Sequence, residues 1–64
     1  MTDPQPAAAT VEQRRAIFRA LLEAQDAGAS VAKSRAEVAE RFGVTAEQVK
    51  EIEQEGVEHE WPPL

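Results

Sequence analysis

Cysteine is absent from this sequence of 64 residues, and histidine and tryptophan each occur once. Without cysteine the chain has no disulfide, no thiolate ligand for zinc and no thiol nucleophile. The single histidine, His59, cannot by itself anchor a structural metal site, and it is expected to be exposed between two glutamates. A catalytic centre also needs an orienting group and a pocket that excludes water, for which so short a chain has little room. We therefore expect a non-enzymatic protein with no metal and no cofactor.

Long apolar runs are missing as well. A helix that spans a bilayer needs about 20 consecutive apolar residues, and the sequence has no such run. The first residues also lack the basic and then apolar order of a signal peptide. We expect a single small domain in the cytoplasm, with no membrane contact.

Basic residues are scarce in the last third of the chain. The formal net charge is −5, and residues 1–41 hold six basic and six acidic groups that balance. Residues 42–64 hold Lys50 as their single cation against six glutamates: Glu47, Glu51, Glu53, Glu55, Glu58 and Glu60. Because proteins bind nucleic acid largely by neutralising phosphates, this part of the chain is poorly suited to do so.

Three capping boxes predict where helices begin. In each box a Ser or Thr side chain and a Glu or Gln side chain three residues later accept each other's backbone N–H. The pairs are Thr10 with Gln13, Ser34 with Glu37, and Thr45 with Gln48. A glycine follows each apolar-periodic segment, as helix ends favour, at positions 28, 43 and 56. These patterns predict an all-α fold of three helices, at about residues 10–27, 34–42 and 45–56.

The predicted domain comprises residues 10–57, with a tail on either side. Residues 1–9 are predicted to be a disordered tail, and residues 58–64 an extended one, because their prolines prevent a fourth helix. In the connection after the first helix, Val31 is expected to fill part of the core. Val57 is expected to fold back onto Ile52, as residues after a helix-ending glycine do. The main core residues expected from the first helix are Ile17, Phe18, Leu21 and Leu22.

The junction between the second and third predicted helices has the spacing of a helix-turn-helix. Ala39, Gly43 and Val49 are separated by four and then six residues. A small residue at 39 lets the helices approach, Gly43 permits a left-handed turn, and Val49 fills the angle between the helices. The spacing predicts two helices that cross steeply over a short turn.

The segment "AEVAERFGVTAEQVKEIEQEGV" resembles the helix-turn-helix of region 4 of bacterial primary-type sigma factors, which reads the −35 promoter element. The resemblance covers about residues 34–57 and includes the turn "FGVT". The matching positions after the turn are Glu47, Val49, Ile52 and Glu53. The resemblance implies a third helix that reads DNA with arginines at three positions and a glutamine at a fourth. This chain has other residues at those four positions: Ala46, Gln48, Lys50 and Glu51.

The expected recognition face comprises residues that point outward when Val49 and Ile52 point inward. Lys50 and Gln54 could donate to base edges, and Glu47 could accept from a cytosine amino group. The full set is Thr45, which could contact a phosphate, with Glu47, Gln48, Lys50, Glu51 and Gln54.

Three glutamates, one of them on this face, oppose DNA binding by this helix. Glu51 would lie near phosphate with no compensating cation in the sequence. Glu53 and Glu55 lie in the C-terminal half of the helix, where the helix dipole disfavours acids. Both are more simply explained as groups that serve solubility or a basic partner.

These observations favour an accessory protein or regulator of transcription that acts mainly through protein contacts. The expected partner is a larger protein with a basic surface, within the transcription machinery, and the isolated chain is expected to bind DNA weakly. One alternative is a direct DNA-binding regulator, as a homodimer, because one small module lacks the area for tight specific binding. Another is a protein-only adaptor or a DNA mimic that occupies a basic groove.

Two side chains have two interpretations each. Arg14 lies near the apolar side of its helix, where an arginine usually lays its stem along the core and keeps its guanidinium in water. The alternative for Arg14 is a specific ion pair. Trp61 and Leu64 make residues 58–64 a candidate partner-binding tail. The favoured interpretation folds Trp61 back onto the core, stacked against Arg14, because residues 10–57 provide a thin core.

Overall fold

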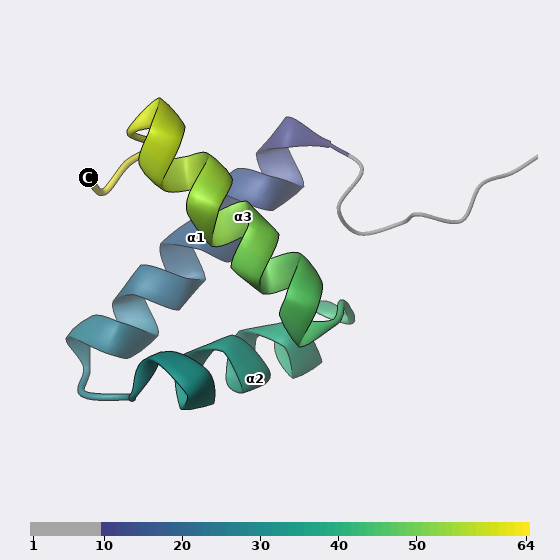
Figure 1. Cartoon of the computed structure of the whole chain (residues 1–64), viewed down its shortest axis with the longest axis vertical. Coiled ribbons are helices and arrows are strands. Elements are labelled where there is room, and N and C mark those ends of the chain that lie inside the picture. The colour runs from purple at the N-terminus through teal and green to yellow at the C-terminus, as the bar shows by residue number, and fades with distance from the viewer. Residues whose placement is uncertain (1–9) are drawn as a thin grey trace, which may run out of the picture.

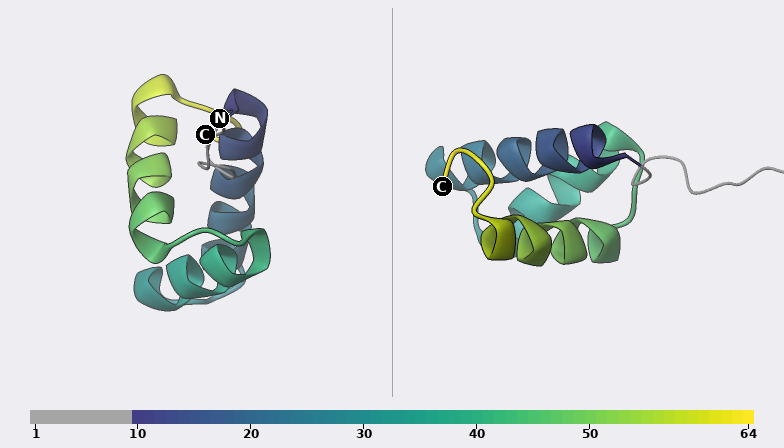
Figure 2. Two further views of the ribbon diagram at one scale, coloured as in Figure 1. Left: turned by 90° about the vertical axis from the view of Figure 1, so that its right-hand side faces the viewer. Right: turned by 90° about the horizontal axis from the view of Figure 1, so that it is seen from above.

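The computed structural model describes residues 10–64, so the predicted tail at residues 1–9 lies outside the described residues. The described part consists of three helices without strands: α1 (Val11–Asp26), α2 (Val31–Phe42) and α3 (Ala46–His59). Helix α3 crosses in front of α1, and α2 lies beneath both (Figure 1). The two views of Figure 2 show α1 and α3 in separate layers, which α2 connects. The prediction of an all-helical, three-helix domain is confirmed.

The starts of α1 and α3 follow the predicted capping residues. Thr10 caps α1, and its Oγ1 accepts the N–H of Gln13 at 3.0 Å. Thr45 caps α3 with a complete capping box: its Oγ1 accepts the N–H of Gln48 at 3.0 Å, and Gln48 Oε1 accepts the Thr45 N–H at 3.0 Å. Each cap satisfies N–H groups that have no partner inside the first turn of a helix.

The predicted start of α2 at Ser34 is wrong. The capping residue is Ser30, whose side chain accepts the N–H of Lys33, and the helix begins at Val31. Ser34 is fully buried inside the helix instead. Its hydroxyl donates to the Val31 carbonyl at 2.8 Å and accepts from Gln25 Nε2 at 3.2 Å, which ties α2 to the end of α1. As the first residue of α2, Val31 is 48% exposed and does not fill the core.

The core draws on all three helices and on Trp61 from the C-terminal segment. Its buried apolar residues are Ile17, Phe18, Ala20, Leu21, Val38, Ala39, Val49, Ile52 and Trp61. Leu22, Phe42 and Val44 pack against this set and are partly buried.

The turn between α2 and α3 depends on Gly43. This residue has φ 72° and ψ 31°, the left-handed conformation that the sequence predicts. Its own N–H and that of Val44 both reach the Ala39 carbonyl, the latter at 2.9 Å, so the last turn of α2 is closed. Ala39 and Val49 are buried on either side of the turn. The turn fixes where α3 leaves α2 and therefore which residues of α3 face outward.

Helix α3 does not end at Gly56, as the sequence predicts, but continues to His59. Gly56 is buried within the helix, and a Cβ at this position would overlap the ring of Phe18. Glycine is therefore present to let α1 and α3 approach closely. Glu60 takes the left-handed conformation that ends the helix. Val57 is accordingly 55% exposed and does not cover the core beside Ile52.

Candidate functional site

The orientation of α3 is fixed by Val49, Ile52 and Gly56, which are its buried residues. The opposite face is exposed, as predicted, and carries Glu47, Lys50, Glu51 and Gln54. Glu58 is exposed on the same face, because 11 residues after Glu47 make about three helical turns. We call Glu47, Glu51, Gln54 and Glu58 the outer stripe of α3.

Two members of the predicted recognition face have another role. Gln48 is only partly exposed, and its side-chain oxygen accepts the N–H of Thr45. The Thr45 hydroxyl is exposed but accepts the N–H of Gln48. Both side chains therefore stabilise the start of α3, and Gln48 lies beside the outer stripe rather than on it.

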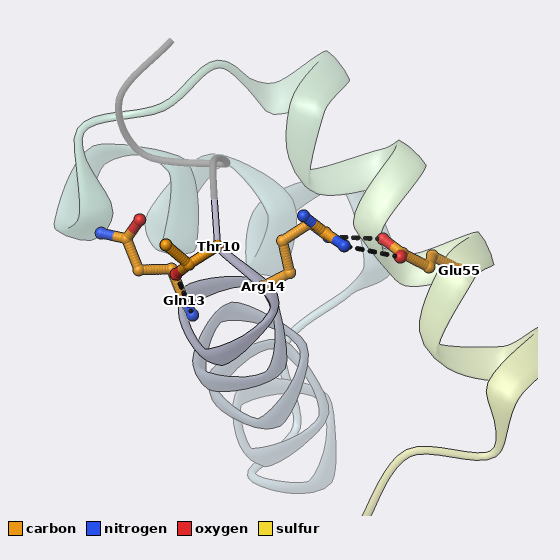
Figure 3. A network of polar contacts seen from close by, with 4 residues as sticks. All are labelled: Thr10, Gln13, Arg14 and Glu55. Carbon is orange, nitrogen blue, oxygen red and sulfur yellow. Dashed lines mark hydrogen bonds and ion pairs between the residues drawn. The ribbon is translucent and has the colours of Figure 1, made fainter.

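Glu55 forms an ion pair between α3 and α1. Arg14 Nε donates to Glu55 Oε1 at 2.8 Å, and Arg14 Nη2 donates to Glu55 Oε2 at 3.1 Å. Figure 3 shows the two parallel contacts, a geometry in which a planar guanidinium matches a carboxylate. The two side chains are 22% and 31% exposed, so water screens the pair only in part. Arg14 thus forms the specific ion pair that the sequence offered as an alternative.

Glu53 forms the corresponding ion pair between α3 and α2. Arg35 Nε and Nη2 lie 3.1 Å and 3.0 Å from Glu53 Oε1. The expectation that Glu53 and Glu55 serve solubility or a basic partner is therefore wrong for both residues. A sequence pattern can reveal ion pairs between residues three or four positions apart on one helix. Glu53 and Glu55 lie 18 and 41 residues from their partners, so no such pattern could reveal these two pairs.

A groove follows the flank of α3 that faces α2. One open hollow of about 510 Å³ is lined by Arg35, Glu53, Gln54, Val57 and Glu58. A second, of about 250 Å³, is lined by Ala32, Arg35, Ala46, Glu47 and Lys50. Because Arg35 lines both, they are neighbours on one surface, which we call the α2–α3 groove. Sequence reasoning missed this groove, since it depends on how the two helices diverge.

Trp61 is buried, with 6% of its surface exposed. Its ring packs against that of Phe18 in a T-shaped arrangement, at a centroid distance of 6.0 Å, and stacks with His59 at 6.0 Å. The guanidinium carbon of Arg15 lies 5.7 Å from the ring centroid, so the cation over the indole is Arg15 and not the expected Arg14. Both views of Figure 2 show the last residues turning back from α3 toward α1. The indole therefore occupies the core, whereas Leu64 is 62% exposed.

Within residues 10–64, no cluster of three or more His, Cys, Asp or Glu side chains has an arrangement that could hold a metal ion. In the same part of the chain, no helix combines the length and the apolar character that crossing a bilayer requires. Comparison of the chain with protein-family models, with curated proteins and with solved structures gave no match in any of the three.

Proposed function

We propose that this protein is a non-enzymatic helix-turn-helix domain that acts as an accessory or regulator of transcription, mainly through protein contacts. The observation that carries the proposal is the charge of the outward side of α3. There Glu47, Glu51 and Glu58 are exposed beside the single cation Lys50. The same face is the one that a helix-turn-helix normally turns to DNA.

Electrostatics favour a protein partner over DNA. Duplex DNA presents closely spaced phosphates, and affinity rises with the number that lysine or arginine side chains neutralise. The outer stripe would instead place three carboxylates against phosphate. A protein surface rich in lysine and arginine complements these carboxylates and would be steered toward them during encounter.

The transcription setting is supported by the resemblance of residues 34–57 to sigma region 4. The left-handed Gly43 and the buried Ala39 and Val49 are what such a turn requires. A protein with this framework and an acidic outer face is suited to contact basic surfaces near a promoter without competing for the promoter itself.

Duplex DNA binding tests the electrostatic part of the proposal. We expect no more than weak binding of a labelled promoter-sized duplex by fluorescence anisotropy, and none that survives 150 mM salt. Size-exclusion chromatography of the same samples reports whether a homodimer forms. A nanomolar, sequence-dependent complex at that salt concentration would contradict the proposal and support the dimeric DNA-binding alternative.

A charge-reversed pair tests whether the carboxylates are what opposes DNA. The variant Glu51→Arg with Glu58→Arg should bind duplex DNA more tightly at low salt. The matched control, Glu37→Arg with Glu40→Arg, makes the same change in net charge on exposed residues of α2. Equal DNA affinity of the two variants would mean that affinity depends on the net charge of the protein alone. The carboxylates of α3 would then oppose DNA no more than those of α2.

Purified bacterial RNA polymerase, with and without its primary sigma factor, tests the transcription setting. We expect the chain to co-elute with one of these forms and to change the yield of a run-off transcript. Co-elution should be lost in Glu51→Arg with Glu58→Arg and kept in the α2 control. Absence of both co-elution and any effect on transcript yield would remove transcription from the proposal.

A further inference from the structure

The α2–α3 groove has a regular geometry about the turn between the two helices. Arg35 lies eight residues before Gly43, and Glu53 lies eight residues after Thr45. The ion pair between Arg35 and Glu53 bridges α2 and α3. Val57 lies twelve residues after Thr45 and lines the larger hollow. Helices α2 and α3 diverge away from the turn (Figure 1), and Val57 is 55% exposed. The groove therefore widens toward one exposed valine of α3.

The length of the groove suits one short helix. Its two hollows follow α3 from Ala46 to Glu58, which at 1.5 Å per residue is about 18 Å. Ala32 and Ala46 have small side chains that leave room in the smaller hollow, and Val57 offers methyl groups in the larger one. An occupant of this length would be a helix of about 12 residues with apolar side chains on one face.

The charges along the groove select a basic occupant. Glu47 lines one hollow and Glu58 the other, three helical turns apart on the same side of α3. Glu51 lies between them on the outer stripe. Of the two cations that line the hollows, Arg35 is already paired with Glu53, and Lys50 is a single cation against three carboxylates. A second copy of this chain carries a net charge of −5 and would be repelled, as would the phosphates of DNA.

We propose that the α2–α3 groove binds a short, basic, amphipathic helix supplied by a partner protein. The apolar face of that helix covers Val57 and the small side chains of Ala32 and Ala46, and its lysine or arginine side chains face Glu47, Glu51 and Glu58. The inference deepens the proposed function, on which it rests for the basic character of the partner, by placing the contact on the α2 flank of α3.

The probe is a synthetic 15-residue peptide of leucine, alanine, lysine and arginine, with leucines at every third or fourth position. A scrambled peptide of the same composition, whose leucines no longer share a face, is the control. Titration of the full-length ¹⁵N-labelled chain should show at least roughly tenfold tighter binding of the amphipathic peptide, since only it buries apolar surface. The amide shifts should centre on Ala32, Arg35, Gln54 and Val57. Equal binding of both peptides, or shifts centred on another face, would overturn the proposal.

Three variants separate the groove from general attraction between opposite charges. Val57→Ser removes exposed methyl groups and should weaken binding of the amphipathic peptide about fivefold. Glu47→Lys with Glu58→Lys should weaken it about tenfold or more, whereas Glu37→Lys with Glu40→Lys should change it far less. All replaced residues are exposed, and thermal melting checks that each variant folds. Similar losses in the two charge-reversed pairs would contradict the assignment to the groove.

The same variants distinguish failure of this inference from failure of the proposed function. If Val57→Ser still co-elutes with polymerase as the unchanged chain does, the proposed function holds and the groove is not its contact surface. If the peptide binds the groove but no polymerase form co-elutes, the groove proposal stands and the transcription setting fails.

Discussion

At the residue scale, Gly56 shows how one missing side chain positions a helix. Glycine inside a helix costs about 1 kcal/mol relative to alanine, so its presence needs a packing reason. The reason is the ring of Phe18, which is fully buried and lies where a Cβ would be. The close approach places α3 on α1 and so directs the outer stripe away from the core.

Gly56→Ala should therefore destabilise the protein by about 2 kcal/mol, despite the better helix propensity of alanine. Chemical denaturation followed by circular dichroism measures the loss. Gln54→Ala, on the exposed side of the same helix, is the control and should stay within about 0.5 kcal/mol of the unchanged chain. If Phe18 is the obstacle, Phe18→Leu combined with Gly56→Ala should cost less than the sum of the two single changes. Simple additivity would contradict the contact.

At the scale of elements, α3 is held on both flanks by ion pairs, with Arg14 of α1 and with Arg35 of α2. Each ion pair forms only when its two side chains face each other. The pairs therefore fix the rotation of α3 about its axis more than they add to the free energy of unfolding. They also remove two carboxylates from the surface that a partner meets. The acidic character of the outward side of α3 therefore comes from the outer stripe alone.

A double-mutant cycle on Arg35→Met and Glu53→Gln should give a coupling energy of about 0.5–1 kcal/mol, because both side chains are mostly shielded from water. The coupling should fall in 1 M salt, where the screening length shortens to about 3 Å. The exposed pair Arg19 and Glu23 is the reference and should show a smaller coupling. Equal coupling in the two pairs would mean that Arg35 and Glu53 do not fix α3.

The turn between α2 and α3 gives a second prediction at this scale. Gly43→Val should cost well over 1 kcal/mol, because a β-branched residue is strained at φ 72°. No atom obstructs a Cβ at this position, so the cost is one of backbone conformation. Gly43→Asn, which tolerates the left-handed region better, should cost clearly less. Equal losses in urea denaturation would point to a packing defect instead.

At the scale of the whole molecule, the C-terminal segment completes the fold. A domain of this size is stabilised by only about 3–10 kcal/mol in total. Trp61 is the largest apolar side chain available to it, and the indole lies against Phe18 from α1. Burial of this one ring is therefore comparable with the net stability, and residues 58–64 belong to the domain as much as to a tail.

Trp61→Ala should accordingly lower the free energy of unfolding by about 3 kcal/mol or more. Deletion of residues 58–64 should lower the melting temperature in the same way. In the unchanged chain the tryptophan emission should be blue-shifted and should move to that of free tryptophan on unfolding. Trp61→Phe keeps an aromatic ring and should lose less stability than Trp61→Ala. Unchanged melting of the truncated chain would return the segment to the role of a partner-binding tail.

The sequence alone determined the features that depend on residues three or four positions apart. The Thr10 and Thr45 caps and the left-handed Gly43 form from local hydrogen bonds and backbone preferences, so each was predicted at the correct position. The exposed side of α3 followed from helical periodicity in the same way. The uneven charge along the chain could also be read directly.

Only the tertiary structure decided where a local signal allows more than one outcome. Ser30 and Ser34 can both cap a helix, and the choice fell to Ser30 because Ser34 is needed in the buried contact with Gln25. Gly56 could end a helix, but Phe18 requires it inside one. The ion-pair partners of Glu53 and Glu55 come from α2 and α1, and the Phe18 ring beside Trp61 comes from α1, all many residues away in the chain. Such contacts depend on how whole helices pack, and no local pattern specifies that packing.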